Sequence, residues 1–272
     1  PNMLHLLADL GVDADGEPII EGLLEAFLEH RTTDGRFEAF AAFIRQPEPA
    51  WSTLACDHYS ITEVLVRFGR ASDPRVQTAL RLAASDLVNT SQGMGCRCLP
   101  HSRTGGRGPG RAADVCPQVT LELLRTFGRL PPGDRPDGLA DVARTVLGVW
   151  RDRSESRPYM FGHGRHFKAI KWPRIWYSDL WMLDALAAYP EVWSGPAADP
   201  RDRRACAELL ACLTAYNTGV DGTVTPRSIY RGFSSFSFGQ KKRPSPIATA
   251  WLAAVLRNYS AIAPDAAMVD VA

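Results

Sequence analysis

The stretch CDHYSITEVLVRFGRASDPRV, residues 56–76, contains the pattern that decides the predicted fold. It begins with polar residues, continues as an apolar helix of about twelve residues, and stops at Phe68-Gly69. A second helix is predicted to start at Asp73-Pro74, because an Asp side chain caps free amides and Pro fits the first helical turn. The stretch therefore predicts two consecutive helices joined by a short turn.

The same pattern recurs along the chain. The related segments are CPQVTLELLRTFGRLPPGDRP from Cys116, WYSDLWMLDALAAYPEVWSGPAADPR from Trp176, SPIATAWLAAVLRNYS from Ser245, and a truncated copy, PNMLHLLADLGVDADGEP, from Pro1. The first helices start near residues 1, 56, 116, 176 and 246, a spacing of 55 to 70 residues. Repeated helix pairs predict one all-α domain over residues 1–272. The first helices are the more apolar, so we expect an α/α toroid with an inner and an outer ring.

The composition is that of an ordinary globular chain. Of 272 residues, 45% are hydrophobic and 22% are charged, with a formal net charge of +1. This balance allows a core and gives no overall field that would attract nucleic acid or an anionic membrane. No apolar run is long enough to span a bilayer. Because the sequence shows no signal peptide, we expect a cytoplasmic protein with reduced cysteines.

Four cysteines lie where predicted first helices begin. They are Cys56, Cys96, Cys98 and Cys116. Inner helices of a toroid run in one direction, so we expect these thiols to meet at one rim, with His58 or His101 able to replace one of them. Thiols and imidazoles in fours are typical of zinc, and an iron–sulfur cluster is the alternative cofactor. Free buried thiols or a disulfide are the alternatives without a metal.

Candidate catalytic residues lie beside these cysteines in the sequence or at the same predicted rim. Asp57 and His58 would act as a base or support the metal, although Asp57 could equally cap its helix. Tyr177 and Asp179 begin another first helix and join them. The remaining cysteines, Cys206 and Cys212, fall within a second helix and are predicted to be core residues.

Two loops that precede the last two first helices interleave basic and aromatic residues. Their candidate substrate-binding residues are His163, His166, Lys168, Lys171, Trp172, Trp176, Arg227, Tyr230, Lys241 and Lys242. Both loops enter the predicted rim, so we expect a cationic bowl for phosphate, diphosphate or carboxylate groups. A solvated surface loop is the alternative, above all for the run 241–243.

The alternation of helix, Asp-Pro-Arg, helix and Asp-Gly turn resembles the α/α toroids of terpenoid cyclases and protein prenyltransferases. Residues 158–186, PYMFGHGRHFKAIKWPRIWYSDLWMLDAL, and 228–246, SIYRGFSSFSFGQKKRPSP, resemble a bacterial prenyltransferase-like group. The resemblance implies a metal-containing transferase or cyclase that acts on a small amphiphilic or isoprenoid substrate. The Asp-x-Asp-Asp and Asp-Asp-x-x-Asp motifs of the cyclases are missing from the sequence.

A second class of function stays open beside the enzyme. Helical repeats commonly present concave surfaces to partners, so the chain could be a binding or scaffold protein with a structural metal site. Nucleic acid is the less expected partner because the net charge is near zero. The last first helix has no predicted second helix, which leaves a gap in the ring or the seam of a homodimer as expectations.

Overall fold

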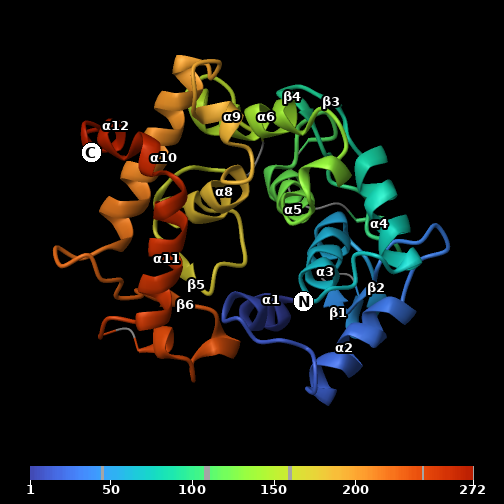
Figure 1. The fold of residues 1–272 in the computed structure, drawn as a ribbon. Coiled ribbons are helices and arrows are strands. Elements are labelled where there is room, and N and C mark those ends of the chain that lie inside the picture. The colour runs from blue at the N-terminus through green and yellow to red at the C-terminus, as the bar shows by residue number, and fades with distance from the viewer. Residues whose placement is uncertain (44–45, 107–110, 159–160, 241, 272) are drawn as a thin grey trace. The chain divides into compact units, whose positions relative to one another are not determined.

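The structure is a computed structural model that describes residues 1–43, 46–106, 111–158, 161–240 and 242–271. The chain divides into two compact units. Unit 1 is Pro1–Gly138 with Pro158, and unit 2 is Leu139–Arg157 together with the chain from Phe161 onward. In Figure 1, unit 1 runs from blue to green and unit 2 from green to red.

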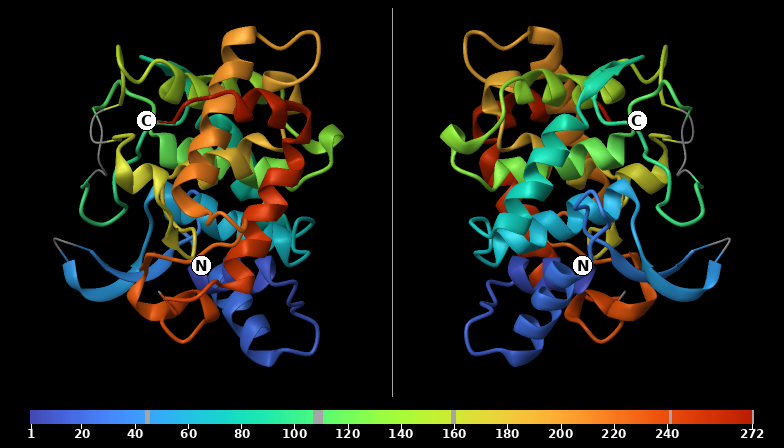
Figure 2. Two further views of the ribbon diagram at one scale, coloured as in Figure 1. Left: turned by 90° about the vertical axis from the view of Figure 1, so that its left-hand side faces the viewer. Right: turned by 90° about the vertical axis from the view of Figure 1, so that its right-hand side faces the viewer.

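Unit 1 is built on helix α3. Its helices are α1 (Asn2–Asp9), α2 (Pro18–Glu29), α3 (Ala55–Arg67), α4 (Pro74–Ser85) and α5 (Pro117–Gly128), with a 3-10 turn η1 at Pro132–Asp134. Its strands are β1 (Ala39–Phe43), β2 (Gln46–Ser52), β3 (Val88–Thr90) and β4 (Gly93–Gly95), which form two antiparallel pairs, β1–β2 and β3–β4. Helices α1, α4 and α5 all pack against α3, with α5 making the largest contact. Figure 2 shows the β1–β2 hairpin extending away from these helices.

Unit 2 is built on the long helix α10. Its helices are α6 (Leu139–Arg151), α7 (Arg165–Lys168), α8 (Asp179–Leu186), α9 (Pro190–Trp193), α10 (Pro200–Asn217), α11 (Pro246–Asn258) and α12 (Ala263–Ala267). Its remaining elements are strands β5 (Lys171–Trp172) and β6 (Ser228–Ile229) and the 3-10 turns η2 (Arg231–Phe233), η3 (Ser237–Gly239) and η4 (Ser260–Ile262). Helices α6, α8, α9 and α12 pack against α10, while β5 and β6 pair in parallel.

Helix starts follow the local sequence signals. The helices that correspond to the predicted first helices begin at Asn2, Ala55, Pro117, Asp179 and Pro246. Helices α4 and α10 begin at the Asp-Pro-Arg motifs, where Asp73 and Asp199 accept hydrogen bonds from the amides of Arg75 and Arg201, each at 2.8 Å. The proline at the first helical position has no amide hydrogen that needs a partner, so Asp-Pro starts a helix at little cost.

The prediction of an all-α toroid is wrong, because the chain is mixed α/β. About 52% of the residues are helical and 8% lie in strands. In the β1–β2 hairpin, the Trp51 ring packs across the strands on Phe40 at 5.6 Å and stacks on His30 at 3.6 Å. Such aromatic pairs stabilise a hairpin. They leave little signal in the sequence, because β2 contains two prolines and no regular alternation of apolar and polar residues.

Helix α5 forms the interior of unit 1. Every residue from Pro117 to Phe127 is buried, although several of these side chains are polar or charged. Burying polar groups costs free energy unless they are paired, so the partners of these side chains determine what the interior can do. None of the described helices is long and apolar enough to cross a membrane.

Candidate functional site

Three cysteines of unit 1 lie together. Cys56 is in the first turn of α3, Cys116 is the N-cap residue of α5, and Cys98 lies in the loop between β4 and α5. The Cys98 and Cys116 thiols share a hydrogen bond, and Cys56 is close enough to act on Cys116 electrostatically. Cys116 is buried, while Cys56 and Cys98 are partly exposed. We call these three residues the thiol cluster.

The loop that carries Cys98 is fixed against the start of α5. The Cys116 amide donates to the Cys96 carbonyl at 2.8 Å, and the Cys96 amide donates to the Thr120 hydroxyl at 3.1 Å. Gly95 allows this loop to lie close to Val115, because a Cβ at position 95 would be only 2.7 Å from a methyl group of Val115. These bonds hold Cys98 beside Cys116.

A second set of bonds ties the same loop to the start of α3. The Ser102 amide donates to the Thr53 carbonyl at 3.0 Å, and the Thr53 amide donates to the Ser102 hydroxyl at 2.9 Å. Thr53 precedes α3 by two residues, so this pairing brings the loop to Cys56. Segments that are distant in sequence therefore meet at the thiol cluster through backbone hydrogen bonds, which do not depend on a metal.

The pKa values of two thiols of the cluster are raised. Burial is the largest cause for Cys56. The hydrogen bond with Cys98, followed by burial, raises the pKa of Cys116 well above its usual range. As the structure places them, no group of three or more His, Cys, Asp or Glu within the described ranges could hold a metal ion, so the three thiols would have to rearrange to bind one. A thiol becomes a metal ligand by losing its proton.

Glu122 adds a buried carboxyl group with a raised pKa near the thiols. Its Oε1 accepts a hydrogen bond of 2.5 Å from Gln118 Nε2. Burial, opposed by this bond but assisted by the negative charge of Asp57, raises the pKa of Glu122 well above its usual range. Glu122 Oε2 and Gln118 Oε1 are buried and have no hydrogen-bond partner among the described residues. Burial thus favours the protonated form of Glu122, within electrostatic range of Cys56, and one of its oxygens has no partner among the described residues.

A buried ion pair lies farther along the same two helices. Arg125 on α5 lies 3.0 Å from Glu63 on α3, and each side chain is only 1% exposed. Burial opposes the charge on Glu63, but Arg125 and the other nearby cations lower its pKa. The α3–α5 interface therefore holds two glutamates whose pKa values are shifted in opposite directions, down for Glu63 and up for Glu122.

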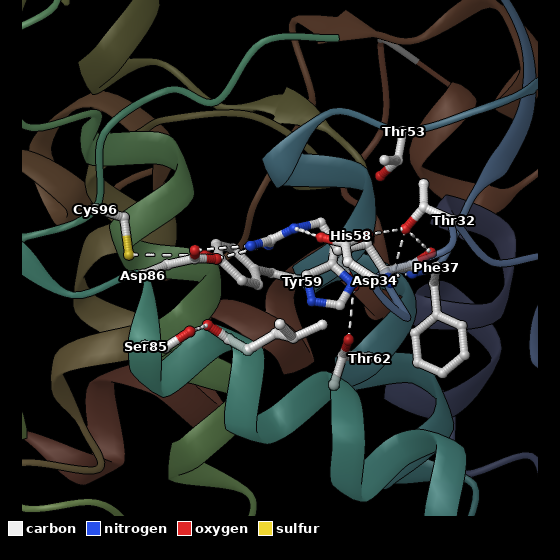
Figure 3. Close-up of polar contacts among 12 residues, drawn as sticks. Thr32, Asp34, Phe37, Thr53, His58, Tyr59, Thr62, Ser85, Asp86 and Cys96 are labelled. Carbon is white, nitrogen blue, oxygen red and sulfur yellow. Dashed lines mark hydrogen bonds and ion pairs between the residues drawn. The ribbon is translucent and has the colours of Figure 1, made fainter. Parts of the chain in front are cut away.

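Cys96 and His58 lie outside the thiol cluster, in a polar network shown in Figure 3. The Cys96 sulfur is 3.9 Å from the Tyr59 hydroxyl, which donates to Asp86 at 2.6 Å. Burial raises the pKa of Cys96 to about 12. His58 accepts a hydrogen bond from the Phe37 amide at 3.1 Å. Three of the four predicted cysteine ligands therefore lie in the thiol cluster, and Cys96 lies apart from them.

The physical reasons for this separation are local. Residues two apart on an α-helix point roughly 200° away from each other, so His58 cannot share the side of α3 that Cys56 occupies. The backbone hydrogen bonds of Cys96 to α5 leave its thiol beside Tyr59. His101, the other predicted alternate ligand, is buried and acts on Asp57 electrostatically, while its Nδ1 accepts from the Thr104 amide at 3.1 Å.

Asp57 caps α3, which is one of the two roles that the sequence predicts for it. Its Oδ2 accepts from the Leu54 amide at 3.2 Å. Burial raises the pKa of Asp57, while the hydrogen bond from the Leu54 amide opposes the change. The carboxyl group remains close enough to the thiol cluster to act on Cys56.

In unit 2, Tyr177 and His163 form a neutral pair. The Tyr177 hydroxyl and His163 Nε2 are 2.8 Å apart. Phe161, Phe167 and Trp150 surround the pair at ring distances of 4.9 to 5.6 Å. Burial, followed by nearby arginines, lowers the pKa of His163 to about 4, so the imidazole is neutral at pH 7.

The pKa of Asp179 is also shifted by burial. Burial raises its pKa well above the usual range, although the Leu180 amide donates to Oδ1 at 2.7 Å and Lys168 favours the charged form. Its Oδ2 has no hydrogen-bond partner in the described chain. The cap of α8 is Ser178, whose hydroxyl accepts from the Trp181 amide at 3.2 Å.

The other predicted substrate-binding residues are spread over unit 2. Lys171 lies over the Tyr230 ring at 4.2 Å, and Trp172 stacks on Trp251 at 5.8 Å. Trp176 is 47% exposed. The exposed basic residues of this set are His166, Lys171, Arg227 and Lys242. Lys241 lies outside the described residues. The predicted cationic bowl therefore remains an expectation, and Lys168 lines a pocket of about 780 Å³.

The sequence analysis missed Glu63, Gln118, Glu122 and Arg125. The available signal was the presence of charged residues in segments that otherwise read as apolar helices, such as LELLRTF at 121–127. Charged residues are rarely buried unless they are paired, so two of them on a predicted inner helix indicate partners on a neighbouring helix. The pairing of Glu63 with Arg125 has this form.

Comparisons with known proteins do not identify a family for this chain. No family model matches the sequence, and no curated protein or solved structure is similar enough to count as a match. The resemblance to prenyltransferases therefore stays an expectation from sequence. The contacts within each unit are the evidence from which a function can be inferred.

Proposed function

We propose that the protein is a zinc-dependent enzyme with its metal at the thiol cluster. The observation that carries the proposal is the meeting of Cys56, Cys98 and Cys116 near the buried carboxyl group of Glu122. Zinc bound by three protein ligands keeps a fourth position for water or substrate, whereas structural zinc sites are closed by four. The separation of Cys96 from the cluster therefore favours a catalytic over a structural metal.

The residues around the cluster fit this use. Cys56 and Cys98 are partly exposed, so a metal ion can reach them, and all three thiols would lose protons on binding. The carboxyl group of Glu122 has a raised pKa and is anchored at one oxygen by Gln118. A buried acid with a raised pKa is suited to proton donation near neutral pH. We assign Glu122 as the proton donor.

The reaction class we propose is transfer of a small amphiphilic or isoprenoid group. Its support is the resemblance to prenyltransferases together with an acid beside the metal, which could protonate a leaving group. A scaffold protein with a structural metal is the second candidate. The observation that favours it is the position of Asp57, whose carboxyl group lies beside Cys56 and would supply a fourth ligand.

The first experiment measures zinc in purified protein and in single Ser variants. We expect about one zinc per chain in the native protein and its loss in Cys56→Ser, Cys98→Ser and Cys116→Ser. Cys96→Ser and Cys206→Ser are matched controls that should keep the metal, because both thiols are buried outside the cluster. Circular dichroism checks that each variant folds. Native protein without bound metal after incubation with zinc would refute the proposal.

A cobalt-substituted protein separates the two candidate functions. Cobalt reports its ligands through absorption, and an open site changes its spectrum when a small thiol such as mercaptoethanol is added. We expect such a change, and we expect it to persist in Glu122→Gln, which removes the proton donor but no ligand. A spectrum that ignores the added thiol, and that Asp57→Asn alters strongly, would support the structural metal instead.

A further inference from the structure

We propose that unit 2 contains a binding pocket for a small organic anion that carries an apolar group. The pocket has a volume of about 780 Å³ and is lined by residues of α6, the turn that follows α6, α7, α10, α12 and the segment that follows α12. This volume lies within the range of small-molecule sites, about 300–1,000 Å³, and is far larger than a simple inorganic anion needs. Helices α10 and α12, on which part of the pocket is built, pack side by side (Figure 1).

Positive charge exceeds negative charge in one part of the pocket. Arg153 and Arg204 share a single carboxylate, that of Glu208, and each contact is long at 3.5 Å. Lys168 has no carboxylate within ion-pair distance in the part of the chain that the structure describes, and its ammonium lies 5.1 Å from the Tyr216 ring. Three cations thus surround one loosely held carboxylate. An anionic group of a ligand would supply the missing negative charge.

The other charges of the pocket do not cancel this excess. Arg203 and Asp265 also line the pocket and form their own ion pair at 2.6 Å. Asp270 and Arg204 also line the pocket, and both are exposed to solvent, Arg204 to 82%, where water screens their charges. The excess positive charge therefore lies mainly with Lys168 and Arg153.

Apolar and aromatic groups line the rest of the pocket. Ala207, Met268 and Val269 contribute aliphatic surface. The Trp150 side chain is almost fully buried, and the Arg153 guanidinium lies 3.7 Å above its ring. Trp150 Nε1 has no hydrogen-bond partner among the described residues, so a polar atom of a ligand could use it. The combination of cations and apolar surface in one pocket selects an amphiphilic anion.

The proposal is independent of the thiol cluster, because all residues of the pocket belong to unit 2. It gives a specific place to Lys168, which the sequence predicted to bind substrate. Glu208 then has a defined role as the carboxylate that the ligand displaces from Arg153 and Arg204. Removing Lys168 should weaken ligand binding, whereas removing the charge of Glu208 should strengthen it. A pocket that is merely a surface depression would respond to neither change.

The test is calorimetric titration of the whole chain with decyl phosphate and decanoate, using inorganic phosphate and decanol as partial probes. We expect one or both alkyl anions to bind more tightly than either partial probe. Lys168→Met should weaken this binding about tenfold, and Glu208→Gln should tighten it severalfold. The control Arg201→Gln should leave binding unchanged, because Arg201 is 71% exposed and outside the pocket.

The outcomes are distinguishable. Equal binding of decanol and the alkyl anions, or equal affinities in Lys168→Met and the native protein, would overturn the proposal. Weaker binding in Glu208→Gln would do the same, because it would show that the carboxylate is not a competitor of the ligand. Cys116→Ser should bind the anions like the native protein, so loss of zinc and loss of the anion site can be told apart.

Discussion

The α3–α5 interface of unit 1 and the aromatic cluster of unit 2 bury polar groups in different ways. The interface contains an ionised pair, Glu63 and Arg125, whose side chains are each 1% exposed. The aromatic cluster contains a neutral pair, His163 and Tyr177, enclosed by aromatic rings. A buried charge depends on its partner, whereas a neutral hydrogen-bonded pair can lose a partner at a smaller cost. Unit 1 is therefore expected to be the more sensitive to single polar substitutions.

The largest loss of folding stability is expected for Glu63→Gln. The substitution leaves the Arg125 charge buried with an amide as its closest partner, and breaking a buried pair in this way typically costs about 3–5 kcal/mol. Urea unfolding measures the loss. The matched control is Asp141→Asn. The ion pair of Asp141 with Arg144 is exposed, with side chains 69% and 43% accessible, so the substitution should change the stability by less than about 0.5 kcal/mol. Equal losses in the two variants would contradict the comparison.

Acidification should destabilise both regions through their buried histidines. Burial, the largest cause in each case, lowers the pKa values of His58 and His163 from 6.5 to about 4. The unfolded state therefore takes up protons first, and stability is lost as the pH falls from about 6.5 towards 4, by roughly 2 kcal/mol for each histidine at pH 5.

The contribution of each histidine to the pH dependence of stability is measured as the difference between the native protein and a variant that lacks that histidine. Glu122 and Asp179 have raised pKa values and shift the pH dependence in the opposite direction, so the slope of the native protein alone is uninformative. Subtracting the curves of His58→Asn and of His163→Gln from that of the native protein removes these acids. A difference that stays constant between pH 7 and pH 5 would show that the histidine is not held neutral.

Tyr177→Phe tests the neutral pair. The substitution removes one hydroxyl and leaves a buried nitrogen of His163 without its partner, at an expected cost of about 1–2 kcal/mol in urea unfolding. Tyr230→Phe is the control, because Tyr230 is half-buried and its ring remains beside Lys171. A loss as large as that of Glu63→Gln would mean that unit 2 is no more tolerant than unit 1.

The smallest losses of stability are expected from removing helix N-caps, and these losses should be equal in the two units. Asp73→Ala and Asp199→Ala each remove an N-cap whose hydrogen bond is 2.8 Å long, and each should cost about 1 kcal/mol. Asp73→Asn and Asp199→Asn keep an acceptor and should lose less. Thermal unfolding of the four variants checks the prediction, and a markedly larger loss at one Asp would show that its motif does more than start a helix.

The sequence predicts what is local. Helix starts at Asp73 and Asp199 depend on residues two positions away, so the Asp-Pro-Arg motifs were sufficient to find them. The buried positions of Cys206 and Cys212 in α10 were likewise predicted correctly from the helical context. The short strands were not predicted, since β5 pairs Lys171 with Ser228, a contact that no local pattern encodes.

The candidate site was predictable only in part, for the same reason. Cys56, Cys98 and Cys116 lie at helix starts or in the loop that joins them, and these positions are visible in the sequence. The direction of the Cys96 thiol depends on the bond from its amide to Thr120, which lies on another element. Glu122 is recognisable as a proton donor only when its burial and the bond from Gln118 are known.

The bond between Arg36 and Asp86 has a consequence for local unfolding. Arg36 belongs to a turn closed by the Thr32 amide, and its guanidinium donates two hydrogen bonds of 2.7 and 2.8 Å to Asp86, the C-cap residue of α4. The turn and the last turn of α4 are thus joined across a long stretch of sequence. Their amide hydrogens should exchange with solvent water at a common rate set by one shared opening, instead of fraying separately as helix ends and turns usually do.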